Sequence, residues 1–112
     1  LTHRPQQREY ARIALANYHG RSKDNLTSYM YGRLLWQLDA YDATIKVLQT
    51  LKNSLTLPLI KETLFMLATS YQHIGDKGLA LTTYRQLLQH ELTPAEKIKT
   101  LDAINRLRWE QK

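Results

Sequence analysis

The chain has 112 residues, of which 43% are hydrophobic and 23% are charged. That composition is ordinary for a globular protein, and the length allows one domain with a modest hydrophobic core. The longest uninterrupted apolar run, Leu64 to Ala68, is far shorter than the roughly 20 residues of a membrane-spanning helix. The chain contains no cysteine, which excludes disulfides, thiol nucleophiles and thiolate metal sites.

Basic residues outnumber acidic ones and give a net charge of +6, with the excess at the two ends of the chain. A basic end can meet nucleic acid, anionic lipid or an acidic protein. We favour solvated helix faces instead, because no run of adjacent basic residues occurs. Aromatic residues are not interleaved with the basic ones, as single-strand binders require, so nucleic acid is disfavoured as a partner.

The first residue is Leu and not Met, so we expect a mature or excised piece of a longer chain, from which targeting signals could have been removed. The lack of cysteine fits a bacterial cytoplasm, a periplasm or an engineered chain equally well. The sequence therefore leaves the compartment open.

The first predicted element is a helix from Gln6 to His19, for which Pro5 suits the first turn. One face of this helix carries Tyr10, Ile13, Ala14 and Asn17 or Tyr18. A neighbouring stripe carries Ala11, Leu15 and Tyr18, so we expect contacts on two sides. The polar tract from His19 to Asn25 contains a glycine and predicts a loop.

A second helix, rich in aromatic residues, is predicted from Asn25 to Gln37. Asp39 and Ala40 supply a turn, and a return helix is predicted from Tyr41 to Lys52. A polar connection, residues 53–58, follows.

The clearest signal is a helical hairpin within residues 64–88. Its first helix carries an apolar stripe at i, i+3, i+4 and i+7, formed by Leu64, Leu67, Ala68 and Tyr71. Gly75 and Asp76 then break the helix. A second stripe is formed by Ala80, Tyr84, Leu87 and Leu88. Ala68 and Ala80 are small enough to let the two backbones approach closely, as an αα-hairpin requires.

This pattern closely resembles the tetratricopeptide repeat (TPR), a 34-residue helix-turn-helix unit. With Lys61 as the first residue, the family's preferred positions hold Leu64, Leu67, Ala68, Tyr71, Gly75, Asp76, Ala80, Tyr84 and Leu87. A shift of 37 residues places Leu34 on Tyr71, Asp39 on Asp76, Ala43 on Ala80, Val47 on Tyr84 and Leu51 on Leu88. This earlier copy departs from the family at Tyr31, where a small residue is expected and Gly32 follows, and at Leu38, which replaces the turn glycine.

The last helix is predicted from Pro94 to about Glu110. Thr93, Pro94 and Glu96 form a strong helix start, with Thr as N-cap and Glu closing a capping box. Four apolar residues are expected to face inward: Ile98, Leu101, Ile104 and Leu107. The many charges of this segment suit a capping helix at the end of a solenoid.

Together these elements predict an all-α fold, a TPR-like α-solenoid of about six antiparallel helices that the resemblance implies to be a right-handed superhelix. The expected divisions of this single domain are 1–24 (leading helix and loop), 25–57 (first repeat), 58–93 (second repeat) and 94–112 (capping helix). A solenoid usually needs about three repeats. Further repeats upstream or a homo-oligomer therefore stay open.

Motifs of catalysis are missing from the sequence. It has no His-Glu-x-x-His, no glycine-rich phosphate loop and no Gly-x-Ser-x-Gly elbow. The four histidines, His3, His19, His73 and His90, have no metal-ligand spacing. The sequence therefore predicts no catalytic residue, no metal site and no cofactor.

The resemblance implies that partners bind in a concave groove lined by the first helix of each hairpin. The groove residues it implies are Tyr29, Gly32, Trp36, Phe65, Thr69, Gln72 and His73. A glycine flanked by aromatics would form a shallow apolar slot there. The alternative is that Tyr29 and Trp36 simply pack between helices. The clamp that some TPR proteins use for a terminal carboxylate lacks its basic residues here, which argues against a chaperone C-terminal peptide.

Three hypotheses of function follow. The leading one is a non-catalytic protein–protein interaction module, a scaffold of a larger bacterial assembly or envelope protein, that binds a peptide or a partner helix. The second is the C-terminal TPR domain of a larger enzyme, such as an envelope metalloprotease. The third is a basic surface that binds nucleic acid or anionic lipid, with a steep salt dependence.

Overall fold

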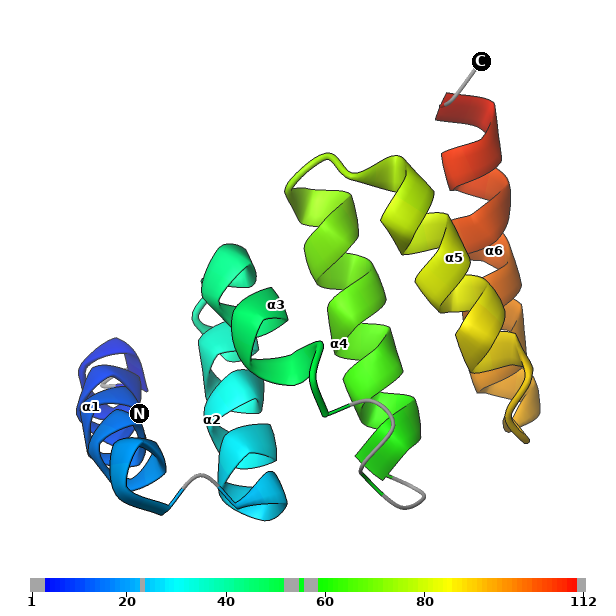
Figure 1. The fold of residues 1–112 in the computed structure, drawn as a ribbon. Helices are drawn as coiled ribbons and strands as arrows, with labels where there is room; N and C mark the ends of the chain where they lie inside the picture. Colours follow the sequence, from blue (N-terminus) through cyan, green and yellow to red (C-terminus); the bar gives the residue numbers. More distant parts are fainter. Residues whose placement is uncertain (1–3, 23, 52–54, 56–58, 111–112) are drawn as a thin grey trace.

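The computed structural model describes residues 4–22, 24–51, 55 and 59–110 (Figure 1). Within these ranges the chain is all-helical and has no strand, which confirms the all-α fold class. The helices are α1 (Arg4–Ser22), α2 (Asn25–Gln37), α3 (Tyr41–Leu48), α4 (Leu59–His73), α5 (Lys77–Leu88) and α6 (Pro94–Glu110). None of them is long and apolar enough to cross a lipid bilayer.

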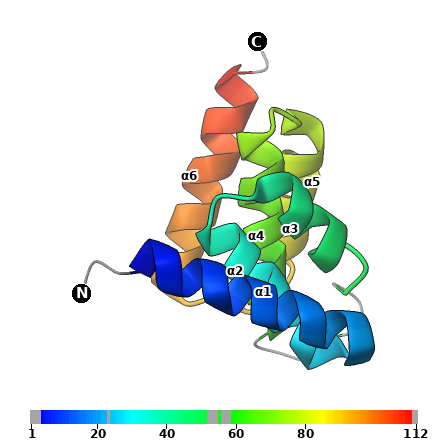
Figure 2. The same cartoon turned by 90° about the vertical axis from the view of Figure 1, so that its left-hand side faces the viewer.

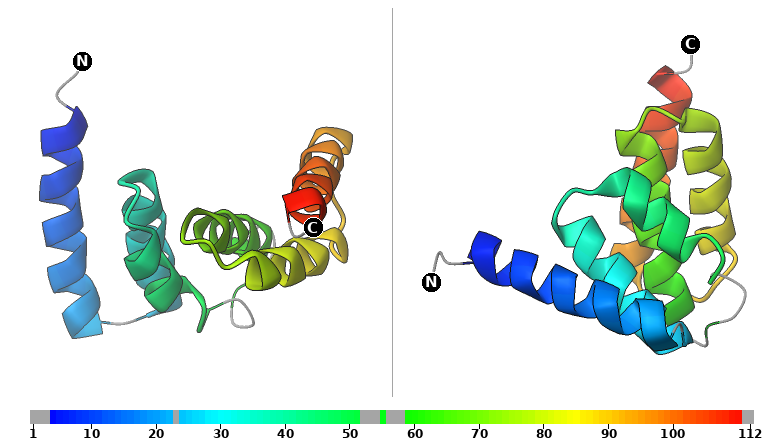
Figure 3. Two further views of the ribbon diagram at one scale, coloured as in Figure 1. Left: turned by 90° about the horizontal axis from the view of Figure 1, so that it is seen from above. Right: turned by 60° about the vertical axis from the view of Figure 1, so that its left-hand side comes forward.

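Each helix packs against the next along the chain, and α2 also packs against α4. Seen from above, α2, α4 and α6 lie on one side of the molecule and α3 and α5 on the other (Figure 3). The helix α1 lies at one edge and runs across the others at a steep angle (Figure 2). It is joined to α2 by a hydrogen bond of 3.2 Å from Arg8 Nη1 to the Gln37 carbonyl oxygen.

The core is divided between the two hairpins, with α4 central to both parts. Between α2, α3 and α4 the buried residues are Tyr29, Ile45, Leu48, Leu51, Met66 and Leu67. Between α4, α5 and α6 they are Ala68, Ala80, Leu81, Tyr84, Ile104 and Leu107. A third, smaller cluster of Ile60, Leu64 and Leu87 joins α4 to α5. Ala68 and Ala80, which were expected at the contact of the two helices, are both fully buried in one cluster.

The hairpins α2–α3 and α4–α5 are equivalent at a shift of 36 residues. Gln37 and His73 end the first helices, and Tyr41 and Lys77 begin the second ones. The buried positions of the second helices follow the same shift, pairing Thr44 with Ala80, Ile45 with Leu81, Leu48 with Tyr84 and Leu51 with Leu87. The predicted shift of 37 residues is therefore wrong by one residue.

The turns explain this difference. Asp39 has a φ of 62° and Gly75 a φ of 90°, so both adopt the left-handed conformation that ends a helix. In each turn the N–H of the next residue donates a hydrogen bond of 2.9 Å to the carbonyl oxygen five residues earlier. These bonds run from Ala40 to Leu35 and from Asp76 to Tyr71. Asp39 therefore takes the place of the turn glycine, and the assignment of Leu38 to that place is wrong. A short polar side chain makes Asp one of the few residues that tolerate this conformation.

The first hairpin also has its small residue one position later than predicted. Gly32 packs so closely on α3 that a Cβ there would lie 2.6 Å from Leu48 Cγ. Tyr31 instead faces α1, where its ring centroid lies 5.4 Å from that of His19. Gly32 is thus the counterpart of Ala68 at a shift of 36 residues.

The start of α6 matches its prediction. The Thr93 N–H donates to Glu96 Oε1 at 2.9 Å, and the Glu96 N–H donates to Thr93 Oγ1 at 3.2 Å. These reciprocal bonds are the capping box. The hydrogen bond from the Thr93 N–H is the main cause of the lowered pKa of Glu96, and the positive charge of Lys61 lowers this pKa further.

Only two of the four residues of α6 that were expected to face inward are buried. Ile104 and Leu107 are buried, but Ile98 is 68% exposed and Leu101 is 41% exposed. The backbone of α6 packs on that of α5, and Ile104 and Leu107 also join the buried cluster that contains Ala68 of α4. The buried stripe of α6 is Thr100, Ile104 and Leu107. Ile98 and Leu101 lie off that stripe and face away from the core.

Helix ends differ from the sequence prediction at several points. The helix α1 continues to Ser22, so Gly20 lies in a helix and the expected loop is shorter. The helix α3 ends at Leu48, because the Leu51 N–H bonds to the Leu48 carbonyl oxygen and tightens the chain into a turn. Most of the predicted connection at 53–58 lies outside the described residues.

Candidate functional site

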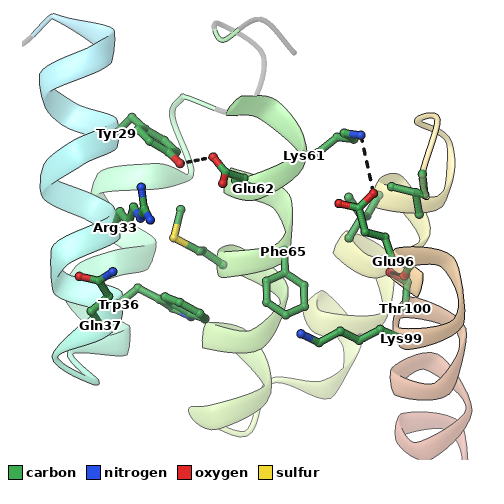
Figure 4. Close-up of a pocket in the computed structure, with 13 residues that line it drawn as sticks. Tyr29, Arg33, Trp36, Gln37, Lys61, Glu62, Phe65, Glu96, Lys99 and Thr100 are labelled. Carbon is green, nitrogen blue, oxygen red and sulfur yellow. Dashed lines mark hydrogen bonds and ion pairs between the residues drawn. The ribbon is translucent and has the colours of Figure 1, made fainter. Parts of the chain in front are cut away.

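A groove with a volume of about 400 Å³ opens between α2, α4 and α6. It is lined by Tyr29, Arg33, Trp36, Gln37, Lys61, Glu62, Phe65, Met66, Leu87, Leu92, Glu96, Lys99 and Thr100 (Figure 4). Side chains of α6 meet α4 further along, at Ile104 and Leu107. The groove therefore lies beside the first half of α6, where its backbone stands apart from that of α4.

An aromatic pair, Trp36 and Phe65, forms the centre of the groove. Their rings meet edge to face, with centroids 6.2 Å apart and an interplanar angle of 68°. The Trp36 indole N–H donates to Thr69 Oγ1 at 2.8 Å, which fixes the ring against α4. Both aromatic side chains are only partly buried, so the pair offers apolar surface of fixed orientation to the groove.

Tyr29 joins α2 to α4 at one end of the groove. Its hydroxyl donates to Glu62 Oε2, and the rest of the side chain is buried. Burial, reinforced by the hydrogen bond to Glu62, raises the pKa of Tyr29 to about 12, while Arg33 acts in the opposite direction. The phenol therefore stays a neutral donor at physiological pH and engages the carboxylate of Glu62.

The opposite wall is held by Lys61 and Glu96. Lys61 Nζ donates to the Glu91 carbonyl oxygen at 2.8 Å and lies 3.8 Å from Glu96 Oε1. Because Glu96 also closes the capping box, both groove carboxylates, Glu62 and Glu96, are engaged within the chain.

Two cations face the groove from opposite sides. Lys99 Nζ of α6 lies 4.6 Å from the centroid of the Phe65 ring, a cation–π contact. Arg33 lies on the α2 side of the groove, one turn from Trp36 on the same helix (Figure 4). Neither forms a salt bridge with a carboxylate in the part of the chain that the structure describes.

The seven groove residues expected from sequence are not all brought together. Tyr29, Trp36 and Phe65 line the groove, and Thr69 lies behind Trp36 as its hydrogen-bond partner. Gln72 is turned toward α5, where its Oε1 accepts a hydrogen bond of 3.1 Å from the Tyr84 hydroxyl.

Gly32 and His73 do not line the groove. The slot predicted at Gly32 is wrong, because the space beside this glycine is occupied by the Leu48 side chain. His73 stacks on Tyr41, with ring centroids 4.2 Å apart and planes 1° from parallel, at the turn of the first hairpin.

Several lining residues were missed by the sequence analysis. Arg33 could have been found, because it lies four residues after Tyr29 and three before Trp36, on the same helix face. Lys99 and Thr100 could not, because their place depends on how α6 rotates when it packs on α5. In sequence, α5 separates them from the α4 wall of the groove.

The groove has the chemistry of a binding surface. Its polar groups are an amide, a neutral phenol, carboxylates with partners, two ammonium groups, a guanidinium and the Thr100 hydroxyl, which donates to the Glu96 carbonyl oxygen at 2.8 Å. Among the described residues no group of three or more His, Asp or Glu is placed to hold a metal ion.

Comparison with known proteins found no protein-family model, no curated protein and no solved structure that matches the chain. The function has to be inferred from the groove itself.

Proposed function

We propose that this chain is a non-catalytic protein–protein interaction module, a helical-repeat scaffold of the TPR type within a larger, bacterial assembly. In this proposal the groove between α2, α4 and α6 binds a peptide or a helix of a partner protein. The observation that carries it is the partly exposed aromatic pair, Trp36 and Phe65, at the centre of that groove.

The repeat character of the chain rests on its two equivalent hairpins. Left-handed residues Asp39 and Gly75 end their first helices, and buried residues recur at the same shift in their second helices. A repeat unit buries its hydrophobic face only by stacking on neighbours, and that stacking leaves one extended face for partners. The right-handed superhelix of TPR proteins is part of the proposal.

Protein binding accounts for the composition of the groove. Aromatic side chains dominate the energy of many interfaces, especially where surrounding groups exclude water. The volume of about 400 Å³ falls within the range of ligand pockets and accommodates a bulky side chain of a partner. Grooves between helices commonly take a peptide or an amphipathic helix through such anchors.

The test is a selection of binding peptides from a random 12-residue phage library, followed by affinity measurements on purified variants. Trp36→Ala and Phe65→Ala are each expected to weaken binding at least tenfold, because truncation of a central anchor costs about 2 kcal/mol or more. Leu79→Ala is the matched control, since Leu79 is an exposed apolar residue of α5 outside the groove. Far-UV circular dichroism verifies that each variant is folded.

An empty selection would overturn the proposal. So would selected peptides that bind folded Trp36→Ala and Phe65→Ala as tightly as the unchanged protein. Loss of binding in both variants, with affinity kept in Leu79→Ala, supports it.

A further inference from the structure

The charged residues around the groove differ in whether they already have a partner within the chain. Three basic residues and two acidic residues line it: Arg33, Lys61, Lys99, Glu62 and Glu96. Both acidic residues have partners in the chain, Tyr29 for one and Thr93 with Lys61 for the other. Lys61 is likewise held by a carbonyl oxygen and by Glu96. Arg33 and Lys99 thus remain as cations without a carboxylate partner among the described residues.

These two cations flank the aromatic pair. Figure 4 shows Arg33 next to Trp36 on the α2 side of the groove and Lys99 beside Phe65 on the α6 side. We infer that the groove selects an acidic peptide segment in which one bulky apolar side chain lies on Trp36 and Phe65 and carboxylates on either side of it reach Arg33 and Lys99. This inference rests on the proposed function and adds the chemistry of the partner.

The position of Lys99 gives the first reason for an acidic ligand. Its ammonium group lies over the Phe65 ring, on surface that an apolar ligand side chain would cover. Such a ligand has to displace the ammonium and break the cation–π contact. A carboxylate next to the apolar side chain offers the displaced ammonium a new partner, whereas a purely apolar ligand leaves it with none.

Arg33 gives the second reason. Its planar guanidinium can donate two parallel hydrogen bonds to a carboxylate, which confers direction as well as charge attraction. The side chain is exposed, so a ligand reaches it without first breaking a salt bridge. Tyr29 engages the nearby carboxylate of Glu62 and interacts with Arg33 through the same hydroxyl, so Arg33 has no carboxylate partner among the described residues.

The charge of the whole chain acts in the same direction. A net charge of +6 on 112 residues creates a positive field that draws anionic partners toward the surface. Attraction of this kind raises association rates and disfavours basic partners. An acidic peptide therefore fits the groove both locally and at long range.

The experiment uses the peptides selected from the random library against the full chain. We expect the enriched sequences to combine a net negative charge with at least one Leu, Ile, Phe, Trp or Met. Affinity for the tightest peptide is expected to fall about fivefold or more in Arg33→Gln and in Lys99→Gln, as is typical for loss of one charged hydrogen-bonding partner. Lys99→Arg keeps the charge and should retain most of the affinity.

Lys46→Gln serves as the control for net charge. Lys46 is an exposed cation of α3 and lies outside the groove, so its removal changes the overall charge but not the site. A synthetic copy of the tightest peptide with Gln and Asn in place of Glu and Asp should also bind at least tenfold more weakly, because charged hydrogen bonds contribute about 1.5–3 kcal/mol.

Three results would overturn the inference while leaving the proposed function intact. The first is a selection of neutral or basic peptides that depend on Trp36 and Phe65. The second is unchanged affinity in Arg33→Gln and Lys99→Gln. The third is unchanged affinity of the synthetic peptide in which Gln and Asn replace Glu and Asp. Failure of the proposed function is separate, since it appears as peptides that bind Trp36→Ala and Phe65→Ala undiminished.

Discussion

At the scale of single residues, Gly32 shows how one missing side chain sets the spacing of two helices. A sequence pattern cannot distinguish a glycine that leaves room for a ligand from one that leaves room for the protein's own side chain. Here the neighbour is Leu48, which is fully buried. The glycine therefore serves the packing of α2 on α3, and the aromatic residues near it in sequence, Tyr29 and Trp36, line the groove beside it.

Gly32→Ala is expected to lower the free energy of unfolding by about 1–3 kcal/mol, the usual cost of forcing an extra methyl into a packed core. The gain in helix propensity, about 1 kcal/mol, offsets only part of this cost. The matched control is Gly78→Ala, because a Cβ at Gly78 has its nearest neighbour at 3.8 Å. That variant should gain about 0.5–1 kcal/mol.

Urea denaturation followed by circular dichroism at 222 nm measures both variants. Opposite signs support the close approach of Gly32 to Leu48. Two variants that are stabilised equally would show that α2 and α3 are not in tight contact at this point.

At the scale of elements, the sequence was informative wherever the determinants were local. Periodic apolar residues, the Gly75 break and the Thr93 capping box predicted the second hairpin and the start of α6. The predicted alignment of the first hairpin with the second was wrong by one residue, because Asp39, and not a glycine, adopts the left-handed conformation. Nothing in the local sequence separates an Asp that ends one helix from an Asp that begins the next, since Asp suits both places.

The groove was likewise predictable only where local sequence determines its walls. Its α2 and α4 walls follow from helix faces, and Tyr29, Trp36 and Phe65 were identified in this way. Its α6 wall depends on which stripe of α6 is buried, and the predicted stripe included Ile98 and Leu101, which are exposed. The packing of α6 on α5, and not its own periodicity, brings Lys99 to the Phe65 ring.

The turn of the second hairpin offers a test at this scale. Gly75→Ala is expected to lower the free energy of unfolding by about 1–2 kcal/mol, because an alanine is strained in the left-handed conformation. Gly75→Asn should cost less than half as much, since Asn visits this conformation readily, as Asp39 does in the equivalent turn. Urea denaturation gives both values.

Gly20→Ala controls for the loss of a glycine as such. Gly20 lies inside α1 with open space around it, so this variant should be neutral or stabilised. Equal destabilisation by Gly75→Ala and Gly75→Asn would contradict the equivalence of the two turns.

At the scale of the whole molecule, two tyrosines connect neighbouring elements through their hydroxyl groups. Tyr29 of α2 donates to Glu62 of α4, and Tyr84 of α5 donates to Gln72 of α4. Both rings are buried at less than 5% exposure, in the two separate halves of the core. The central helix α4 is therefore bonded to α2 and to α5 by the hydroxyl groups of neutral phenols.

This arrangement makes the stability of the fold sensitive to alkaline pH. Burial raises the pKa of both Tyr29 and Tyr84 to about 12, against an ordinary value of 10.0. Because the folded state holds these protons more tightly than the unfolded chain, their contribution to stability is fully present below pH 10. It is lost as the pH rises from about 10 through 12.

Tyr29→Phe and Tyr84→Phe measure this contribution. Between pH 9 and pH 11 the unchanged protein should lose about 1 kcal/mol more unfolding free energy than each variant, a discounted share of the 1.36 kcal/mol per pKa unit. Titration of the tyrosinate absorbance at 295 nm should show one late-ionising group fewer in each variant than in the unchanged protein. An exposed tyrosine of α1, in the variant Tyr10→Phe, is the control and should leave the pH dependence unchanged. A pH dependence that is the same in all four proteins would mean that neither phenol is held neutral by the fold.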